Sequence, residues 1–414
     1  MVKIAAITLI PTERTVTTFG ILAGEPSGDR LGAGLMRGIK AQQPNVEFVG
    51  IGGPQMIAEG LDTLVPMERL AVNGFIEPIK RLPDLIKILR LLLRTFSAQR
   101  PNAFIGVDFN VFNFLLEGML KRRGIPTAHY VSPSVYAWRR GRIRRIARST
   151  DLLLTLYPFE PAFYDQSGVV ARYVGHPLAD EISLTAGGDR ARLDARRELG
   201  VAGAGRCIAI LPGSRMSEVK LLSARFLAAC EIIHARLPGT VFVVPCLRDS
   251  IEAWLHTEID RHPDLNIVSY LGNGRLALRA CDAAIVKSGT STLEAMLLRR
   301  PMVVSYRLGA LSYQLVSRLV RSPFIALPNI LAGRELVPEL LQDAATPQAL
   351  AENLLNVLDK AVREPEYLAA FAQLHEQLRC SADDRAAEAI LSWQRDLLDS
   401  TDTEENTNAN TKVS

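Results

Sequence analysis

The chain has only five cysteines, and none of them forms a C-x-x-C pair. An odd number at wide spacing excludes a zinc ribbon and a disulfide framework, and it fits a reducing cytosol. The six histidines form no H-E-x-x-H element. We therefore expect neither a metal site nor a cofactor.

Aromatic residues are also few, at 6% of the 414 residues, which argues against stacking platforms for single-stranded nucleic acid. No sign of charge dominates, because 48 basic residues face 44 acidic ones, and a net charge of +4 does not suggest a nucleic-acid partner. No run reaches about 18 apolar residues, so no membrane-spanning helix is predicted. The N-terminus, MVKIAAITLIPTERTV, lacks the cleavage site of a secretion signal. The length then favours a cytosolic protein of more than one domain.

Short β-rich apolar runs alternate with amphipathic helical patterns along most of the chain. The first series predicts strands at 17–24, 46–53, 103–108 and 125–132, and helices at 31–42, 82–99 and 112–124. The second predicts strands at 207–213, 240–246, 281–289 and 301–306, and helices at 217–237 and 291–299. This alternation indicates parallel sheets with helices on both faces. The predicted fold is α/β, with two Rossmann-like domains and a ligand cleft between them.

The chain divides into five predicted segments. These are an N-terminal extension (1–16), an N-terminal Rossmann-like domain (17–180), a C-terminal Rossmann-like domain (181–364), C-terminal helices (365–398) and a tail (399–414). The tail carries one apolar side chain beyond alanine, so we predict that it is disordered.

Two polar features follow strands of the first series. AGEPSGD (23–29) opens a helix, where small residues let the backbone approach a ligand and helix amides favour an anion. It is not a G-x-S-x-G elbow, and a tight turn capped by Asp29 explains it equally well. Asp108 ends AFIGVD (103–108), where open sheets place reactive groups, although a lone aspartate there is often only the N-cap of the next helix.

Two loops of the second series have the composition of a phosphate site. In LPGSR (211–215), Gly213 and Ser214 offer backbone amides and Arg215 offers a forked cation. KSGTSTLE (287–294) provides the polar turn Ser288–Thr290, and Glu294 can accept from ribose hydroxyls or act as a capping-box partner of Ser291. Two such loops in one domain favour a nucleotide site over two ordinary turns.

These motifs occur in one order with several others. The others are HYVSPSVYAWRRGRIRRIARSTDLLLTLYPFEPAFY (129–164), VGHPLAD (174–180) and LPNILAGRELVPELLQ (327–342). The pattern closely resembles the lipid-A-disaccharide synthase family, bacterial glycosyltransferases with the GT-B architecture. The resemblance covers roughly residues 18–396.

The resemblance implies an activity and a set of site residues. The donor would be UDP-2,3-diacylglucosamine and the acceptor 2,3-diacylglucosamine 1-phosphate (lipid X), giving a β-1,6 disaccharide 1-phosphate and UDP for lipopolysaccharide assembly. The implied UDP-site residues are Gly213, Ser214, Arg215, Ser288, Gly289, Thr290, Glu294 and Asn329. The implied acceptor-side residues are Glu25, Ser27 and Asp29, and the catalytic residue is Asp108.

One segment departs from the family pattern. Members of the family often carry two aspartates where this chain reads GVDFNVFN (106–113). Asp108 corresponds to the first aspartate, and Val111 stands at the second position. We therefore predict Asp108 as the base that activates the acceptor hydroxyl.

Both implied substrates carry acyl chains, so we expect the protein to work at the cytosolic face of the inner membrane, attached peripherally to anionic lipid. Arg90 and Arg94 on a basic helix could dock there, as could Arg139, Arg140 and Arg142 in WRRGRIRRIAR (138–148). The charge run could instead be a solvated face. The alternatives to a transferase are a UDP-sugar 2-epimerase and a non-enzymatic lipid-surface protein. The sequence leaves a homodimer open.

Overall fold

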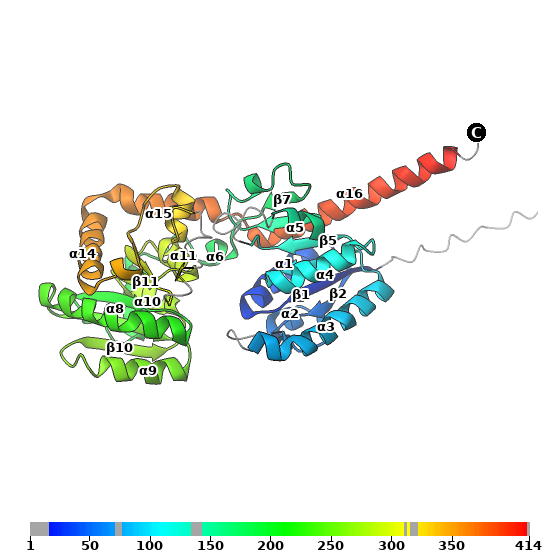
Figure 1. Ribbon diagram of the computed structural model, residues 1–414. Coiled ribbons are helices and arrows are strands. Elements are labelled where there is room, and N and C mark those ends of the chain that lie inside the picture. Colours follow the sequence, from blue (N-terminus) through cyan, green and yellow to red (C-terminus); the bar gives the residue numbers. More distant parts are fainter. Residues whose placement is uncertain (1–15, 71–76, 134–142, 310–312, 315–321, 412–414) are drawn as a thin grey trace, which may run out of the picture.

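The computed structural model describes residues 16–70, 77–133, 143–309, 313–314 and 322–411 of the chain. Figure 1 shows two α/β lobes, each built around one sheet, and a long last helix that runs from the second lobe across the first. Every strand pair in the described residues is parallel, which confirms the predicted fold class.

The N-terminal lobe contains a seven-stranded sheet in the order β3-β2-β1-β4-β5-β6-β7. Its strands are β1 (Thr17–Ala23), β2 (Val46–Ile51), β3 (Leu61–Thr63), β4 (Ala103–Val107), β5 (Thr127–Tyr130), β6 (Leu152–Thr155) and β7 (Val170–Tyr173). Its helices are α1 (Pro26–Gln42), α2 (Pro54–Ala58), α3 (Glu77–Gln99), α4 (Asn110–Lys121) and α5 (Ile143–Ser149), with 3-10 turns at Met67–Arg69 and Pro161–Phe163.

The C-terminal lobe contains a six-stranded sheet in the order β10-β9-β8-β11-β12-β13. Its strands are β8 (Arg206–Leu211), β9 (Thr240–Cys246), β10 (Asn266–Leu271), β11 (Ala283–Lys287), β12 (Met302–Tyr306) and β13 (Glu339–Leu341). Its helices are α7 (Asp189–Glu198), α8 (Met216–Arg236), α9 (Asp249–Ile259), α10 (Gly274–Ala280), α11 (Thr290–Leu297), α13 (Leu327–Ala332), α14 (Pro347–Arg363) and α15 (Pro365–Leu378), with a 3-10 turn at Gln342–Ala344. Helix α6 (Pro177–Glu181) joins the lobes, and α16 (Ala382–Thr411) returns to the first.

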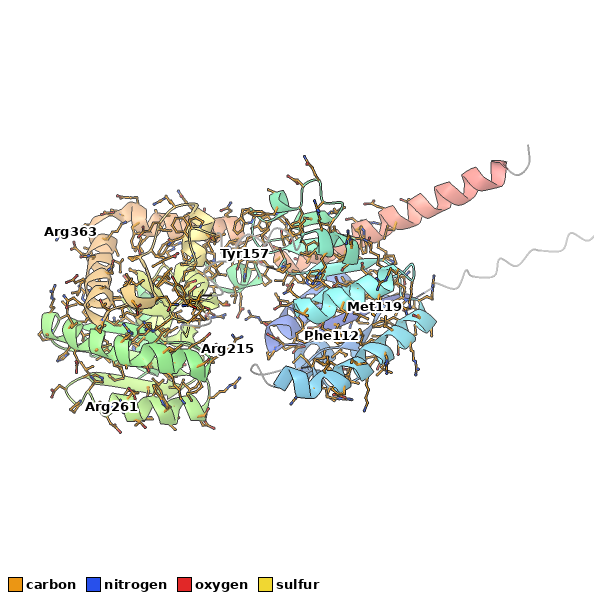
Figure 2. All side chains as sticks on the ribbon, in the orientation of Figure 1. Phe112, Met119, Tyr157, Arg215, Arg261 and Arg363 are labelled. Carbon is orange, nitrogen blue, oxygen red and sulfur yellow. The ribbon has the colours of Figure 1, made fainter. Side chains whose placement is uncertain are left out.

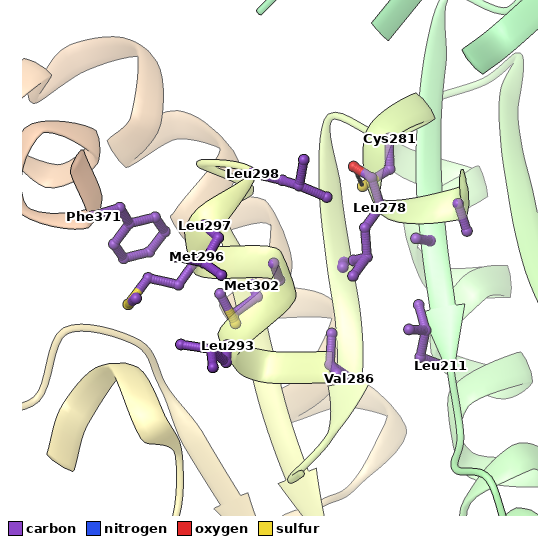
Figure 3. Packing of buried hydrophobic residues seen from close by; sticks show 14 of the residues in the cluster. Leu211, Leu278, Cys281, Val286, Leu293, Met296, Leu297, Leu298, Met302 and Phe371 are labelled. Atoms are coloured by element: carbon purple, nitrogen blue, oxygen red, sulfur yellow. Dashed lines mark hydrogen bonds between the residues drawn. The ribbon is translucent and has the colours of Figure 1, made fainter. Parts of the chain in front are cut away.

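The central strands are mostly apolar because helices cover both faces of each sheet. Every residue of β4 and of β9 is buried, as expected for interior strands of a parallel sheet. In the N-terminal lobe, α1 and α16 cover one face while α3 and α4 cover the other. In the C-terminal lobe, α8, α9 and α14 cover one face and α10, α11 and α15 the other. Figure 3 shows the second of these layers, where Phe371 of α15 packs beside Met296 and Leu297 of α11.

Helix α16 completes the core of the N-terminal lobe by packing on α1. Ala386, Ile390 and Trp393 of α16 are buried together with residues of β1, β4 and α1. Helix α1 presents small residues to this contact. A side chain at Gly38 would put its Cβ 2.7 Å from the carbonyl oxygen of Asp383. The close approach of the two helices therefore depends on glycine in α1.

The chain passes between the lobes twice, and the two passages are bonded to each other. The amide of His176 donates to the carbonyl of Leu378 at 3.0 Å, and the hydroxyl of Tyr173 donates to the carbonyl of Gln377 at 2.7 Å. The carboxylate of Asp180 accepts from the amides of Ser381 and Ala382, the first residues of the α16 turn, at 2.9 and 2.6 Å. The lobes are thus joined by two connecting segments that are hydrogen-bonded to each other.

The structure differs from the prediction in the tail. Residues 399–411, predicted to be disordered, continue α16 as a helix to Thr411, which extends beyond the lobe in Figure 1. Extending an existing helix adds one hydrogen bond for each residue that is fixed. Starting a helix is less favourable, because several residues must be fixed before the first hydrogen bond forms. The buried part of α16 supplies that start, so polar composition alone is a poor guide here.

Candidate functional site

Asp108 directly follows β4 at the carboxyl edge of the first sheet. Its backbone has φ of 48°, and so does that of Phe109, so two consecutive non-glycine residues are left-handed. Val131, after the neighbouring strand β5, is left-handed as well, with φ of 87°. Each such residue costs about 1–3 kcal/mol, and such strain gathers at functional sites. The strained turn leaves the Asp108 side chain half-buried at the edge of the sheet.

Backbone and amide groups hold this turn in place. The Asp108 amide donates to the carbonyl of Tyr130 at 2.8 Å. The buried Asn113 side chain donates to the carbonyl of Asp108 at 2.7 Å, and Asn110 Nδ2 lies 3.2 Å from Asp108 Oδ1. Sequence reasoning missed both asparagines, because their roles depend on where α4 returns to its own first turn. One carboxylate oxygen of Asp108 has a fixed donor. Asp108 is not the N-cap of the next helix, because Phe109 takes that position and no side chain caps α4.

The AGEPSGD loop lies against the Asp108 turn. A Cβ at Gly24 would lie 2.5 Å from the ring of Phe109, so only glycine allows the two loops to touch. Glu25 and Ser27 are exposed in this loop. Asp29 is buried instead, and its carboxylate accepts from the amides of Gly53, Gln55 and Met56 at 2.8–3.0 Å. Asp29 thus caps α2 and not α1. Its carboxylate is used by these amides and is not open to an acceptor.

A buried polar cluster follows β5 and β6 at the same edge. Glu160 Oε2 accepts from the amides of Leu156 and Tyr157 at 3.1 and 3.0 Å. Burial raises the pKa of the Glu160 carboxyl to about 8, against the lowering effect of these amides and of Ser132. Ser132 in turn lies 2.8 Å from the hydroxyl of Tyr164. The cluster ties the loop after β5 to the loop after β6.

The second sheet carries a cavity of about 280 Å³ at its carboxyl edge. It is lined by Leu211, Gly213, Ser214, Glu218, Pro245, Leu247, Gly274, Lys287, Gly289, Thr290 and Ser291. The structure therefore brings Gly213 and Ser214 of the first predicted loop to Gly289 and Thr290 of the second. Gly213 has φ of 137°, and a Cβ there would lie 2.7 Å from Glu218, so both conformation and space require glycine.

Two charged residues of this cavity were not predicted. Lys287 Nζ lies 2.9 Å from Glu218 Oε1, and it also lies 5.1 Å from the centre of the Tyr306 ring. Glu218 Oε2 accepts from the amides of Ser214 and Arg215 at 3.2 and 3.4 Å. The spacing of Glu218, three residues after the first residue of the turn, is a capping-box signal that the sequence did contain.

Arg215 and Glu294, both predicted for the UDP site, are not among the residues that line the cavity. Arg215 is exposed and immediately precedes α8. Figure 2 shows it at the end of α8 that is nearer to the N-terminal lobe. Glu294 Oε1 accepts from Nε and Nη2 of Arg275, both at 3.1 Å. Its partner is thus an arginine of α10, and Ser291 is not its capping partner.

Arg275 continues this contact toward the other lobe. Its Nη1 lies 2.6 Å from Glu181 Oε1 in α6, and Glu181 Oε2 lies 3.5 Å from Arg30 Nη1 in α1. Charges alternate along Glu294, Arg275, Glu181 and Arg30, which we call the interlobe ion chain. Arg30 directly follows the AGEPSGD loop. The interlobe ion chain therefore runs from Glu294, predicted for the UDP site, to the loop predicted for the acceptor side.

Asn329 and Ser288 were predicted to contact UDP. In the structure their side chains bond to other residues of the chain. Asn329 is completely buried; it donates to Val337 and Glu339 and accepts from the amides of Leu336 and Val337, all within 2.7–2.8 Å. These bonds use its whole hydrogen-bonding capacity. Ser288 Oγ donates to the carbonyl of Ile325 at 3.0 Å. Both residues shape the loops around the cavity, and this geometry does not present Asn329 to it.

The predicted lipid-contact residues fall in two places. Arg90 and Arg94 are exposed on α3. Arg139, Arg140 and Arg142 lie outside the described residues. The exposed large apolar side chains of α3 and of the adjacent α4 are Leu82, Ile86, Leu91, Val111 and Leu115. We call these residues, with Lys87, Arg90 and Arg94, the α3–α4 surface. Val111 is 90% exposed there.

Two properties of the described residues bear on ligands and membranes. No group of three or more His, Cys, Asp or Glu side chains within the described ranges could hold a metal ion. Among the helices described, none combines the length and the apolar character that crossing a bilayer requires.

The chain is similar to known proteins over most of its length. A protein-family model described as lipid-A-disaccharide synthetase matches residues 19–390. A lipid-A-disaccharide synthase of Sodalis glossinidius is 49% identical over 376 residues, covering 91% of this chain and 97% of the relative. One of Pseudomonas putida is 48% identical over 376 residues, covering 91% and 98%.

Solved structures share the two-lobe form at low sequence identity. MurG of Acinetobacter baumannii has a TM-score of 0.54 at 14% identity, covering 91% of this chain and 99% of its own. A UGT transferase of Siraitia grosvenorii, solved with UDP, has 0.58 at 12%, covering 92% and 100%. A UDP-GlcNAc 2-epimerase of Neisseria meningitidis has 0.57 at 10%, covering 91% and 98%. At these identities the likeness shows the fold alone.

Proposed function

The chain belongs to the lipid-A-disaccharide synthase family, and from this premise we infer which of its residues carry out the glycosyl transfer. The activity is that of a glycosyltransferase with a GT-B fold in lipid A biosynthesis. We propose UDP-2,3-diacylglucosamine as donor and lipid X as acceptor. UDP and a β-1,6-linked disaccharide 1-phosphate are the products.

The cavity of the C-terminal lobe is the proposed donor site. The observation that carries this assignment is that two separate glycine-containing loops, at Gly213–Ser214 and Gly289–Thr290, line one cavity at the carboxyl edge of the sheet. Both loops lead into helices, α8 and α11, whose first amides favour a diphosphate. Pro245 and Leu247 add an apolar wall suited to the uracil ring of UDP.

Asp108 is the proposed base. Transfer from an α-linked donor to a β product inverts the anomeric centre, so one displacement suffices and no covalent enzyme intermediate is needed. Asp108 would take the proton of the acceptor 6-hydroxyl as the oxygen attacks. The amide of Asn110 orients one carboxylate oxygen and leaves the other for this proton. Val111 cannot share the task, because its side chain has no titratable group.

The leaving diphosphate needs positive charge. Arg215 stands at the first turn of α8, where its guanidinium can fork onto phosphate oxygens. The amides at the start of α8 add the positive end of the helix dipole. Loss of one such donor typically costs about 3 kcal/mol in the transition state. Glu25 and Ser27, exposed beside the Asp108 turn, are the proposed acceptor contacts.

The α3–α4 surface is the proposed membrane contact. Its exposed apolar residues and three basic residues belong to helices of the lobe that carries Asp108. Each lysine or arginine near an anionic surface contributes about 1 kcal/mol, so three support reversible attachment. The acyl chains of both substrates could then stay in the lipid while their sugars enter the site.

The test is acceptor-dependent release of UDP by the wild type and by Asp108→Asn. The wild type should release UDP from UDP-2,3-diacylglucosamine only when lipid X is present. Asp108→Asn should lower turnover by about 100-fold or more, with UDP affinity nearly unchanged, because only proton transfer is lost. UDP release without acceptor would indicate hydrolysis of the donor, and conversion of the donor into an isomeric UDP sugar would indicate an epimerase. Near-normal turnover in the variant would move the base elsewhere.

A further inference from the structure

A carboxylate of the protein itself occupies the anion position of the proposed donor cavity. Glu218 reaches back from the first turn of α8 to the amides of Ser214 and Arg215, at 3.2 and 3.4 Å. Its other oxygen meets the ammonium of Lys287 at 2.9 Å. Both side chains are largely enclosed, at 16% and 18% exposure.

These partners are the ones a phosphate group would use. Backbone amides at a helix start and one lysine are ordinary phosphate ligands, and Ser214, Glu218 and Lys287 all line the cavity. A diphosphate and the Glu218 carboxylate cannot accept from the same two amides together. Two anions side by side would also repel each other strongly in an enclosed site. One of them must therefore leave.

We propose that Glu218 is a built-in anion that holds the phosphate position of the cavity until the donor diphosphate displaces it and pairs with Lys287. The proposal rests on the UDP-sugar function proposed above. It assigns Lys287 as a diphosphate-binding residue and Glu218 as a competitor of the ligand.

The exchange of partners keeps every charge neutralised. Lys287 is never left enclosed without an anion, which would be costly, because Glu218 or phosphate always faces it. The ring of Tyr306, 5.1 Å from Lys287 Nζ, helps to hold the ammonium during the exchange. After transfer, the return of Glu218 favours release of UDP. Gly213 leaves room for Glu218 in the position described here, since a Cβ there would collide with the Glu218 side chain.

The test measures binding of UDP, inorganic pyrophosphate and uridine to the full chain by calorimetry. Glu218→Gln removes the charge and should tighten UDP and pyrophosphate by roughly threefold to tenfold, because a neutral amide competes less. Lys287→Met should weaken both by roughly tenfold through loss of a charge-assisted contact. Uridine has no phosphate, so its affinity should not change in either variant.

Glu231→Gln is the matched control, since it removes a half-exposed carboxylate from the other end of α8 and should leave all three affinities unchanged. Glu218→Ala covers the case in which Glu218→Gln does not fold, and it should also tighten UDP. Equal or weaker UDP binding in a folded Glu218 variant would overturn the displacement and leave Glu218 as a helix cap.

The same three ligands separate this proposal from the proposed function. Suppose that pyrophosphate affinity responds to both variants as predicted, but uridine does not bind and UDP binds no more tightly than pyrophosphate. The displacement of Glu218 then stands, and the assignment of the cavity to a nucleotide sugar is wrong. If uridine and UDP bind well but neither variant alters UDP affinity, the nucleotide site stands and displacement is wrong.

Discussion

At the scale of single residues, Glu160 makes the stability of this protein depend on pH. Its pKa is about 8 in the folded chain because the carboxyl is buried, against an ordinary value of 4.5. Between these values the unfolded chain releases a proton that the folded chain keeps. The unfolded state therefore binds fewer protons, and the free energy of unfolding falls as pH rises through this window, by about 1.4 kcal/mol per pH unit.

Chemical unfolding of wild type and Glu160→Gln at pH 6.5 and pH 8 measures this effect. The wild type should lose roughly 2 kcal/mol more than the variant over that interval. His176 does not interfere, because burial lowers its pKa to about 4 and its contribution is the same in both proteins, so it cancels from the difference. Glu47→Gln, at an exposed glutamate of β2, should behave like the wild type. Equal pH dependence in wild type and Glu160→Gln would mean that Glu160 is ionised in the folded protein.

The same scale shows which part of the site the sequence could predict. Gly213, Ser214, Gly289 and Thr290 were predicted and line the cavity, because composition after a strand reports local backbone exposure. Partners that meet only after folding were missed, such as Lys287 beside Glu218. Asn329 was predicted as a ligand contact, but no local pattern reveals that its amide is used by its own loop.

At the scale of elements, long periodic segments were predicted well and short edge strands were not. Strand β9 was predicted over its whole length, since seven consecutive buried residues give a clear signal. Strands β3 and β13 have three residues each and lie at sheet edges, too short for a pattern. In α3, the basic helix predicted to dock on lipid, Leu92 is buried in the core. The periodic pattern predicted the position of the helix, but it did not predict which face of the helix packs against the sheet.

The α3–α4 surface gives the prediction at this scale. Charge reversal at Arg90 and Arg94 should abolish most binding to vesicles that contain anionic phospholipid at low salt, since each basic residue contributes about 1 kcal/mol. Affinity for UDP should not change, because the cavity lies on the other lobe. Co-sedimentation with vesicles measures the first quantity and calorimetry the second. Binding of the wild type should fall at high salt through screening.

Charge reversal at Arg261 and Arg363 is the control. Both are exposed, and Figure 2 places them on the C-terminal lobe, away from α3 and α4. This variant has the same net charge as the first and should still bind vesicles. Should both variants lose binding equally, net charge alone drives attachment and the α3–α4 surface has no special part in it.

At the scale of the whole molecule, the interlobe ion chain relates the two half-sites. Glu181 contacts Arg275 of one lobe and Arg30 of the other. Exposed ion pairs contribute at most about 1 kcal/mol, so Glu181→Gln should hardly change the unfolding temperature. It should loosen the arrangement of the lobes, seen as a larger radius of gyration by small-angle X-ray scattering. Arg37→Ala, which breaks the exposed Arg37–Glu59 pair within the N-terminal lobe, should leave the radius unchanged. An unaltered radius in Glu181→Gln would show that the double passage of chain fixes the lobes by itself.

The return of α16 to the first lobe also bears on how the protein is made. The strands of the first sheet leave the ribosome early, but Ala386, Ile390 and Trp393, which cover one of its faces, are synthesised near the end. At about 5–20 residues per second, the whole C-terminal lobe intervenes, a delay of roughly 10–40 seconds. During that time the first lobe is a nascent domain with an open apolar face, a natural client for chaperones. Translation that stops before α16 leaves an assembled second lobe attached to an unfinished first one.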